Sequence, residues 1–384
     1  MQITAMPSEL VDVLNKVLPA VGKTEITTCV RLCVENSVLT ASCSDGEISL
    51  TTSYHLNDCE DGDICVIAKT FVDTLKKLKP DVMVKIKTLE NNRVSICSGK
   101  FRNYLQYLES DMFPIVVNEN SISSVTFKTQ QLYSLLDGVK FCVSQDSYRA
   151  FLKGGSFTFG NDGVDVVTSN GHMMAYCGTS AGVSNDLDPI IIPKRSLDVI
   201  ATLTKASEDE TVIMRVAKNS ISMVIGDICF NSVLISATFP HVTPMINFNS
   251  NIRVVLDREE FIESMKRVSI TSNALNRAVA FTLSGNTVSL SSKNSKQEEA
   301  VDEMTTIHVV NTSGKEEFST AFNSEYMMNV LSRIDTPKFC FNASTQGNNV
   351  RVTSCNSDDC LSTDNSIPSV NDDEYIFLIS KVII

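Results

Sequence analysis

Apolar residues recur at helical spacing in six segments of the chain. In "SELVDVLNKVL", which begins at Ser8, Leu10 and Leu14 fall on one helix face. The same spacing predicts further helices at residues 69–79, 128–140, 193–205, 257–267 and 322–333. Asp257 is predicted to cap its helix, because a glutamate follows three residues later, and Pro193 suits a first helical turn.

Between these segments, polar and apolar residues alternate over short stretches, which is typical of half-buried strands. One such stretch follows the first helix and reads "VRLCVENSVLTASCSDGEISLTTSY". Its "VENS", and later "GNDG" and "LSGN", contain residues that favour tight turns between strands. Residues 354–375 are polar and acidic, so they are predicted to form a loop before the last strand.

The order of helix, strands, helix and strands occurs three times, with matching helices about one domain length apart. Two repeats also close on similar signatures, "YLESDMFPI" and "LISATFPHV". The pattern therefore predicts an α+β fold of three tandem domains with one topology, each with two helices and about eight antiparallel strands. We place these domains at residues 1–121, 122–249 and 250–384.

The composition is that of a globular protein. The 384 residues are 43% hydrophobic, and no apolar run reaches the ~18 residues that a membrane span needs. The first residues lack the basic and apolar regions of a secretory signal. We therefore expect a cytoplasmic protein without membrane contact. The twelve cysteines lie mostly in apolar or alternating runs, so we expect buried thiols and no disulfides.

The charge is distributed unevenly. The six helical segments contain 14 basic and 10 acidic residues, a net charge of +4, whereas the whole chain carries −12 and the remainder therefore −16. If the helices share an orientation, they form a positive surface on an acidic body. Such a surface can follow a phosphate backbone without reading bases. The alternative explanation is that Lys and Arg simply favour helices.

Two other classes of function can be weighed from the residues. For an enzyme, His172 with Asp146 and a nearby cysteine could imitate a nucleophilic arrangement. However, the four histidines have no metal-ligand spacing, and there is no C-x-x-C and no phosphate-binding glycine loop. We therefore expect no catalytic residues, no metal and no cofactor. A structural repeat protein without a DNA role would show neither a common orientation of its basic residues nor an apolar pocket.

Several segments together carry a family resemblance: "YRAFLKGGSF", "TSNGHMMAYC", "PIIIPKRSLDVI", "ATFPHV", "NSKQEEAVDEM" and "AFNSEYMMNVLSRI". In this order, and with the threefold repeat, the chain resembles the bacterial sliding clamp, the beta subunit of DNA polymerase III, from end to end. The resemblance implies a head-to-tail homodimeric ring whose helices line a pore around duplex DNA. It also implies a non-catalytic processivity factor.

The resemblance further implies partners and a site for them. In the family, short peptide motifs from the polymerase III alpha subunit, the clamp-loader complex, other DNA polymerases and repair proteins bind a hydrophobic pocket. The family has Gly-His-Arg-Leu where this chain has residues 171–174. Carried over, the pocket residues are Arg149, Leu152, Ser169, Gly171, His172, Met173, Met174, Pro240, Met245, Leu378, Ile379 and Ser380.

Two further sets of residues follow from the same resemblance. The candidate phosphate contacts in the pore are Lys23, Lys76, Lys77, Lys194, Arg195, Lys266 and Arg267. The candidate dimer contacts are Leu105 of the first domain and Ile270 and Thr271 of the third. Contacts to phosphate alone would hold DNA without sequence preference.

Overall fold

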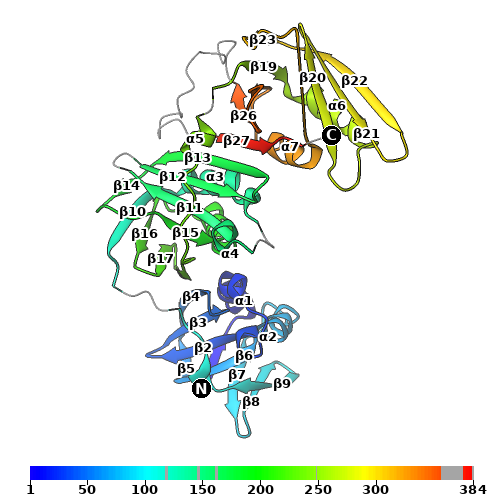
Figure 1. The fold of residues 1–384 in the computed structure, drawn as a ribbon. Helices are drawn as coiled ribbons and strands as arrows, with labels where there is room; N and C mark the ends of the chain where they lie inside the picture. Colours follow the sequence, from blue (N-terminus) through cyan, green and yellow to red (C-terminus); the bar gives the residue numbers. More distant parts are fainter. Residues whose placement is uncertain (117–119, 145–147, 161–162, 248, 356–374, 383–384) are drawn as a thin grey trace. The chain divides into compact units, whose positions relative to one another are not determined.

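The computed structural model describes residues 1–384 except 117–119, 145–147, 161–162, 248, 356–374 and 383–384 (Figure 1). The chain forms two compact units. The first consists of Met1–Gln130, Gly182–Asp186 and Asp198–Leu234, and the second of Gln131–Ala181, Leu187–Leu197 and Ile235–Ile384. The middle repeat therefore contributes to both units.

The three repeats have the same order of elements. The first contains β1 (Gln2–Ala5), α1 (Pro7–Val17), β2 (Cys29–Glu35), β3 (Val38–Ser44), β4 (Ile48–His55), β5 (Asp58–Glu60), β6 (Gly62–Ile67), α2 (Ala68–Lys76), β7 (Val84–Leu89), β8 (Arg93–Ser98) and β9 (Phe101–Leu108). The second contains β10 (Ser123–Lys128), α3 (Thr129–Val139), β11 (Gly154–Phe159), β12 (Gly163–Ser169), β13 (Met173–Ser180), β14 (Gly182–Val183), β15 (Ile190–Pro193), α4 (Lys194–Ala206), β16 (Thr211–Val216), β17 (Ser220–Ile225) and β18 (Ile228–Val233).

A short helix, α5 (Thr243–Ile246), precedes the third repeat. That repeat contains β19 (Ile252–Asp257), α6 (Arg258–Ser269), β20 (Ala278–Ser284), β21 (Thr287–Lys293), β22 (Glu299–Thr305), β23 (His308–Asn311), β24 (Glu317–Asn323), α7 (Ser324–Leu331), β25 (Lys338–Ala343), β26 (Asn349–Cys355) and β27 (Tyr375–Ser380). The 3-10 helices are η1 (Leu18–Ala20), η2 (Ile26–Thr28), η3 (Ser110–Met112), η4 (Lys140–Cys142) and η5 (Ala150–Lys153).

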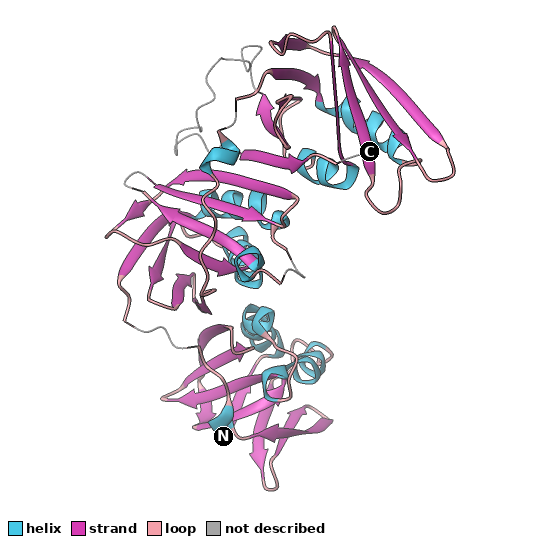
Figure 2. Cartoon of the chain, in the orientation of Figure 1, coloured by secondary structure: helices cyan, strands magenta, loops and turns pink. Residues whose placement is uncertain are grey.

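All six predicted helices are present, so the α+β fold with one repeated topology is confirmed (Figure 2). Within the described ranges each repeat has nine strands rather than about eight. The additional strand is a short one in each repeat: β5, β14 or β23. Asp257 caps α6 as predicted: its Oδ1 accepts from the Glu260 amide at 2.9 Å. Pro193 differs from the prediction, since it ends β15 and pairs with Gly154.

In the first unit, fourteen described strands form one antiparallel sheet. Its two repeats meet where β18 pairs with β4, with Phe230 opposite Leu50. Lys16 of α1 also forms an ion pair with Asp227, at 2.6 Å, just before β18. Hydrogen bonds between β18 and β4 and the Lys16–Asp227 ion pair thus join the first repeat to part of the second.

In the second unit, nine described strands form a sheet in the order β15-β11-β12-β13-β27-β26-β25-β19-β23. Here the two repeats meet where β27 pairs with β13. One sheet face is packed with phenylalanines: the Phe281 and Phe341 rings stack at 4.2 Å, and Phe261 meets Phe339 edge-on at 5.1 Å. These contacts join the nine-stranded sheet to α6 and to a separate four-stranded sheet.

Among the strand edges that lack a complete partner within the described residues, those of β9 and β22 stand out. On the side away from β8, β9 pairs with β6 only at Tyr107 and Leu108. β22 is the last strand of the four-stranded sheet, β22-β21-β20-β24. Both edges therefore expose backbone groups that another strand could pair with.

Candidate functional site

A tight turn introduces β13. Asn170 Oδ1 accepts hydrogen bonds from the amides of His172 and Met173, both at 2.9 Å. Ser169 Oγ donates to the Met173 carbonyl at 2.8 Å and accepts from the Gly171 amide at 3.0 Å. Gly171 has φ +91°, a left-handed conformation that glycine adopts without steric cost. The turn residues thus set where the side chains of β13 point.

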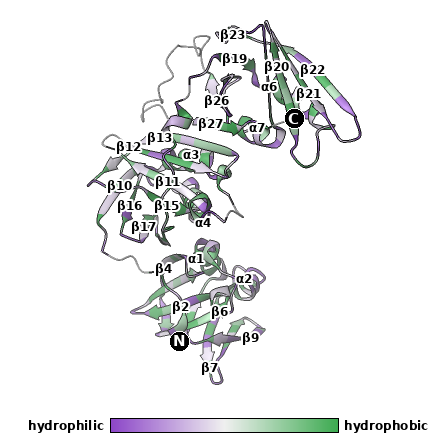
Figure 3. Cartoon of the chain, viewed as in Figure 1, coloured by the Kyte–Doolittle hydropathy of each residue, from purple (hydrophilic) through white to green (hydrophobic). Residues whose placement is uncertain are grey.

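An apolar surface lies where β13 meets β27. Met174 is opposite Leu378, and Tyr176 is opposite Ile376. Because strand side chains alternate between faces, these residues share one side of the sheet. They form a buried cluster with Val167 of β12 and Ile246 of α5. Apolar residues also run along β27 itself (Figure 3).

Met173 and Ile379 lie on the other side of this sheet. They are paired with each other, one residue away from the Met174–Leu378 pair, so alternation directs their side chains away from the cluster. Both are buried. Of the predicted pocket residues on these two strands, the structure therefore brings Met174 and Leu378 together and separates Met173 and Ile379 from them.

The segment around α5 covers the cluster (Figure 1). Its covering side chains are Phe239, Val242 and Ile246. Pro240 and Met245, the residues predicted from sequence, are exposed instead. A four-residue helix has too few positions to show periodicity, so the sequence gives little signal for which residue faces inward.

The loop before β11 contributes a second border. Leu152 of η5 is buried, and its Cδ1 lies 3.8 Å from where a Cβ on Gly171 would stand. The ring of Phe151 meets Phe239 edge-on at 5.7 Å. Arg149 is exposed and its Nε donates to the Tyr148 hydroxyl at 3.3 Å. This loop therefore brings Leu152 near the turn, while Arg149 faces solvent.

His172 is held through its backbone and exposed at its ring. Its carbonyl accepts from the Ser380 amide at 2.8 Å, and its ring stacks against Tyr326 at 6.2 Å. Ser380 Oγ lies 3.4 Å from Asn349 Oδ1. Tyr326 of α7 was not selected from the sequence, because nothing in its local pattern links it to residue 172. Asp146, weighed as a catalytic partner of His172, lies outside the described residues.

The predicted pore residues occupy different environments. Lys266 pairs with Glu263 at 2.7 Å, and Arg267 pairs with Asp302 at 2.6 Å. The other five are on α2, on α4 or in a loop: Lys76 and Lys77 at the end of α2, Lys194 and Arg195 at the start of α4, and Lys23 between η1 and η2. Lys266 and Arg267 thus already have carboxylate partners within their own repeat.

The predicted dimer residues also differ in exposure. The Ile270 side chain, at the end of α6, is 82% exposed. Thr271 is half-buried, with its hydroxyl 2.7 Å from Ser292 Oγ. Leu105 is half-buried on β9. Leu275, which was not selected from the sequence, is 95% exposed in the loop after α6.

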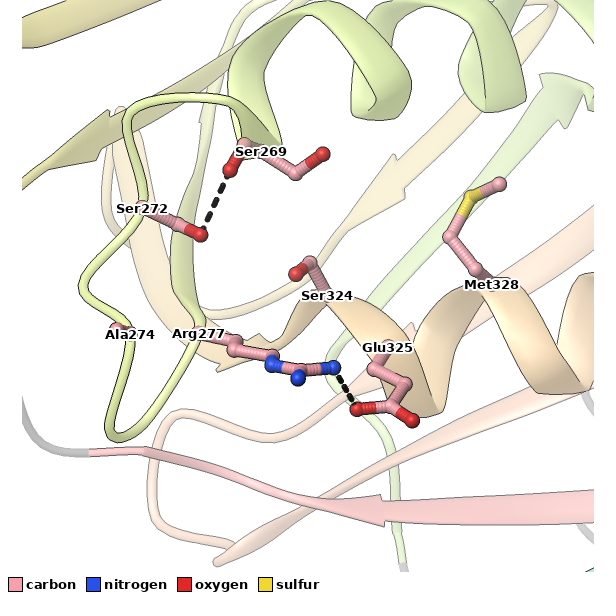
Figure 4. Close-up of a pocket in the computed structure, with 7 residues that line it drawn as sticks. All are labelled: Ser269, Ser272, Ala274, Arg277, Ser324, Glu325 and Met328. Atoms are coloured by element: carbon pink, nitrogen blue, oxygen red, sulfur yellow. Dashed lines mark hydrogen bonds and ion pairs between the residues drawn. The ribbon is translucent and has the colours of Figure 1, made fainter.

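A separate cavity lies between the end of α6 and the start of α7 (Figure 4). Its volume is about 340 Å³. An ion pair between Arg277 and Glu325 borders it, and the Ser272 hydroxyl donates to the Ser269 carbonyl at 2.7 Å. Met328 supplies an apolar side. The cavity adjoins the loop of Leu275 and is distinct from the apolar cluster on β13 and β27.

Among the described side chains, no group of three or more His, Cys, Asp or Glu residues could hold a metal ion. The expectation of reduced cysteines is wrong at Cys355, which is disulfide-bonded, while the remaining described cysteines are free thiols. None of the described helices combines the length and apolarity needed to cross a membrane.

Comparison with known proteins identifies relatives along the whole chain. Residues 1–117, 126–241 and 245–363 match the family models of the N-terminal, central and C-terminal domains of the DNA polymerase III beta subunit. The beta sliding clamp of Pseudomonas aeruginosa is 28% identical over 334 residues, covering 86% of this chain and 89% of that protein. The beta sliding clamp of Vibrio cholerae is 26% identical, covering 87% and 90%.

Solved structures have a similar fold. A crystal structure of the DNA polymerase III subunit beta from Pseudomonas aeruginosa aligns with a TM-score of 0.89 and 24% identity, and covers 100% of both chains. A sliding clamp from the same organism, solved bound to griselimycin, aligns with a TM-score of 0.87 and 25% identity over 100% of both chains.

Proposed function

Because the chain belongs to the family of the DNA polymerase III beta subunit, the sliding clamps of DNA replication, we propose that it is a processivity factor. In this proposal a ring of two copies encircles duplex DNA and tethers the replicative polymerase. The observation that carries it is the match of all three family domains, in order, to one chain with one repeated topology.

Ring closure is proposed to use the open edges of β9 and β22. Within the chain, the last strand of one repeat pairs with the fourth strand of the repeat before it: β18 with β4, and β27 with β13. By the same rule β9 of one copy would pair with β22 of another, near Leu105 and Ile270. Charge supports this pairing, because β22 contains Glu299, Asp302 and Glu303, whereas β9 contains Arg102. The exposed Leu275 would add apolar area.

DNA is proposed to pass through the ring without base-specific contacts. Lysine and arginine side chains on or near helices can neutralise phosphates, and such contacts weaken steeply as salt rises. Lys266 and Arg267 would have to exchange their carboxylate partners for phosphate. We therefore propose Lys23, Lys76, Lys77 and Lys194 as the stronger phosphate contacts, with Arg195 as a further contact.

Partner proteins are proposed to bind the apolar cluster. Met174 and Leu378 lie beneath the partly buried Phe239 and Val242, and together these residues have the apolar character that leucine or phenylalanine anchors of a peptide need. Methionine adapts to different partners, which suits a site shared by the polymerase III alpha subunit, the clamp loader, other DNA polymerases and repair proteins. His172 and Tyr326 would form a stacked border of the same site.

The remaining parts of the proposal follow from the family. The protein would have no catalytic activity, no cofactor and a cytoplasmic location. Its three domains would be residues 1–121, 122–249 and 250–384. The ATP hydrolysis needed to load the ring onto DNA would be carried out by the clamp loader, an external ATPase.

Topological binding to DNA tests this function. The protein is loaded by a bacterial clamp-loader complex and ATP onto a nicked circular plasmid, and the DNA-bound fraction is isolated by gel filtration. We expect the protein to stay on the circle in moderate salt and to leave when a restriction enzyme linearises the plasmid. Equal retention on circular and linear DNA, or strong sequence-specific binding to short duplexes without the loader, would overturn the sliding ring. The Ile270→Ala, Leu105→Ala double variant should be retained less.

A further inference from the structure

A buried cation lies next to the apolar cluster. Arg351 of β26 is opposite Leu378, which is itself opposite Met174, so the three side chains form one row on the same face of the sheet. The Arg351 side chain is only 8% exposed. Burying a cation costs free energy unless the cation makes polar contacts there.

Arg351 contacts the short helix that covers the cluster. Its Nη1 donates to the carbonyl of Ile246, the last residue of α5, at 3.4 Å. The last carbonyls of a helix lack partners inside the helix, and cations near them are favoured. Ile246 itself is 1% exposed and packs in the cluster with Met174 and Leu378. One contact thus links the sheet under the cluster to the helix over it.

A second arginine holds the other end of the same segment. The row on the sheet continues from Arg351 to Asn342 and then to Arg253 of β19. Arg253 Nε donates to Ser250 Oγ at 3.0 Å, four residues after Ile246. The two arginines therefore contact the chain at Ile246 and at Ser250, and of these two positions only Ile246 belongs to the cluster.

We propose that Arg351 is a positioning residue for the peptide pocket. It holds the end of α5 so that Ile246 stays against Met174 and Leu378 when no peptide is bound. This inference rests on the proposed function of that cluster. If the α5 segment is already ordered before the peptide binds, binding does not have to supply the free energy of ordering it. Removing the Arg351 contact should therefore weaken affinity and speed dissociation. The guanidinium suits this role because it stays charged and offers several donors.

The test measures binding of a fluorescent peptide with leucine and phenylalanine anchors, derived from a replicative polymerase, to the full-length protein. Arg351→Met should weaken binding about tenfold, through faster dissociation, as expected for a lost hydrogen bond to a charged group. Arg351→Lys should recover part of the affinity. Arg253→Met is the matched control, because it removes a cation from the same face but away from Ile246, and it should bind nearly as the unmodified chain does.

A merely structural role predicts other results. If Arg351→Met lowered the melting temperature strongly and Arg351→Lys restored neither stability nor affinity, the positioning role would be wrong. Hydrogen exchange gives a second readout: in Arg351→Met the amides of Ile246 and Asn247 should exchange faster, while those of β26 stay protected. Unchanged exchange at both amides would also overturn the inference.

Met174→Lys separates this inference from the proposed function. If Met174→Lys abolishes peptide binding and Arg351→Met leaves it unchanged, the pocket stands and the role of Arg351 is wrong. If Met174→Lys leaves binding unchanged, the peptide binds elsewhere, and the pocket and the positioning residue fail together.

Discussion

Neighbouring repeats of the chain meet at two strand junctions, β4 with β18 and β13 with β27. The two junctions have the same backbone conformation but different side chains. The turns before β4 and β13 are "SDG" at residues 44–46 and "SNG" at 169–171. In each, the serine hydroxyl donates to a carbonyl four residues on, at 2.9 and 2.8 Å, and the next side chain accepts from two amides. The glycines have φ of +90° and +91°. In each, the carbonyl after the glycine accepts from the strand of the following repeat.

The side chains that follow these turns are opposite in character. On the β4–β18 junction the matching positions are polar or small: Ser49, Thr51, Cys229 and Asn231. On the β13–β27 junction they are apolar or aromatic: Met174, Tyr176, Ile376 and Leu378. The covering segments differ in the same way, since Ser49 Oγ donates to the Val116 carbonyl, whereas Met174 packs with Ile246.

This difference separates architecture from function. Both junctions have the same kind of turn and the same strand pairing. The fold alone therefore does not make a binding site. Four substitutions on one face decide whether the junction is filled by hydroxyl and amide hydrogen bonds or offers an apolar surface. The comparison therefore predicts that the proposed peptide pocket can be removed while the pairing of β13 with β27 is kept.

The largest expected effect comes from copying the polar junction into the apolar one. Met174→Ser with Leu378→Asn gives the β13–β27 face the residues of Ser49 and Asn231. Without an apolar floor, two anchor side chains of a polymerase-derived peptide would lose apolar burial of about 1.5–3 kcal/mol each, so binding should weaken more than about 100-fold. Fluorescence anisotropy measures this loss.

Because both replaced side chains are buried, the double variant will also lose stability. Ile379→Ala is the control, since Ile379 is equally buried but lies on the opposite face of β27. It should melt at a lower temperature and still bind the peptide. Equal loss of binding in both variants would mean that stability, rather than the apolar face, explains the effect.

An intermediate effect is expected from the shared turn. Gly46→Ala and Gly171→Ala each force a side chain into the left-handed region, at a cost of about 1–2 kcal/mol. Neither added Cβ would meet a neighbour closer than 3.8 Å, so the backbone conformation alone sets the cost. Urea unfolding should show similar losses of stability for both variants, while only Gly171→Ala weakens peptide binding. A clear difference between the two losses would show that the turns are not equivalent.

The smallest effects concern one carboxyl near each junction. Burial raises the pKa of Asp165, although the Tyr176 hydroxyl bonds to it at 2.9 Å and partly offsets the rise. Stability linked to a raised carboxyl pKa is present below its unfolded value and is lost as pH rises through the folded value. Asp165→Asn should therefore stabilise the protein at neutral pH, by on the order of 1 kcal/mol, and lose this advantage in acid.

Asp227 should respond to pH with the opposite sign. Burial alone would raise its pKa, but hydrogen bonds from Lys16 and Thr52 hold the pKa below its ordinary value. Its contribution is thus present above the unfolded value of about 4 and is lost as pH falls through the folded value. The aspartate is half exposed, so Asp227→Asn should cost less than about 0.5 kcal/mol at pH 7. Unfolding curves across pH that slope alike for both variants would contradict this contrast.

The elements of the fold could be predicted because their signals are local. Apolar spacing located six of the seven α-helices among the described residues and missed the four-residue α5, whereas the cap at Asp257 needed only a glutamate three residues on. Pro193 was assigned to a helix rather than to the end of β15, because proline is tolerated in both places. The disulfide at Cys355 contradicts the expectation of free thiols, which rested on finding no secretory signal in the sequence.

The site depended on features that no local pattern contains. The register that places Met174 against Leu378 joins segments about 200 residues apart, and a shift of one residue would bring Met173 and Ile379 to the face of the apolar cluster instead. The family resemblance pointed to this part of the chain. It could not show which of the adjacent residues Met173 and Met174 faces the apolar cluster. Tyr326 became visible only through its contact with the ring of His172.

The two open edges, β9 and β22, also bear on how many copies assemble. In the proposed head-to-tail contact the two surfaces differ, so nothing in the contact itself stops a third copy from adding. Each paired junction sets an angle between the two repeats that it joins. Whether the copies close into a ring or continue as a filament depends on all of these angles, including those at the junctions inside the chain. A substitution that alters the β4–β18 or β13–β27 ladder could therefore convert rings into filaments while leaving β9 and β22 unchanged.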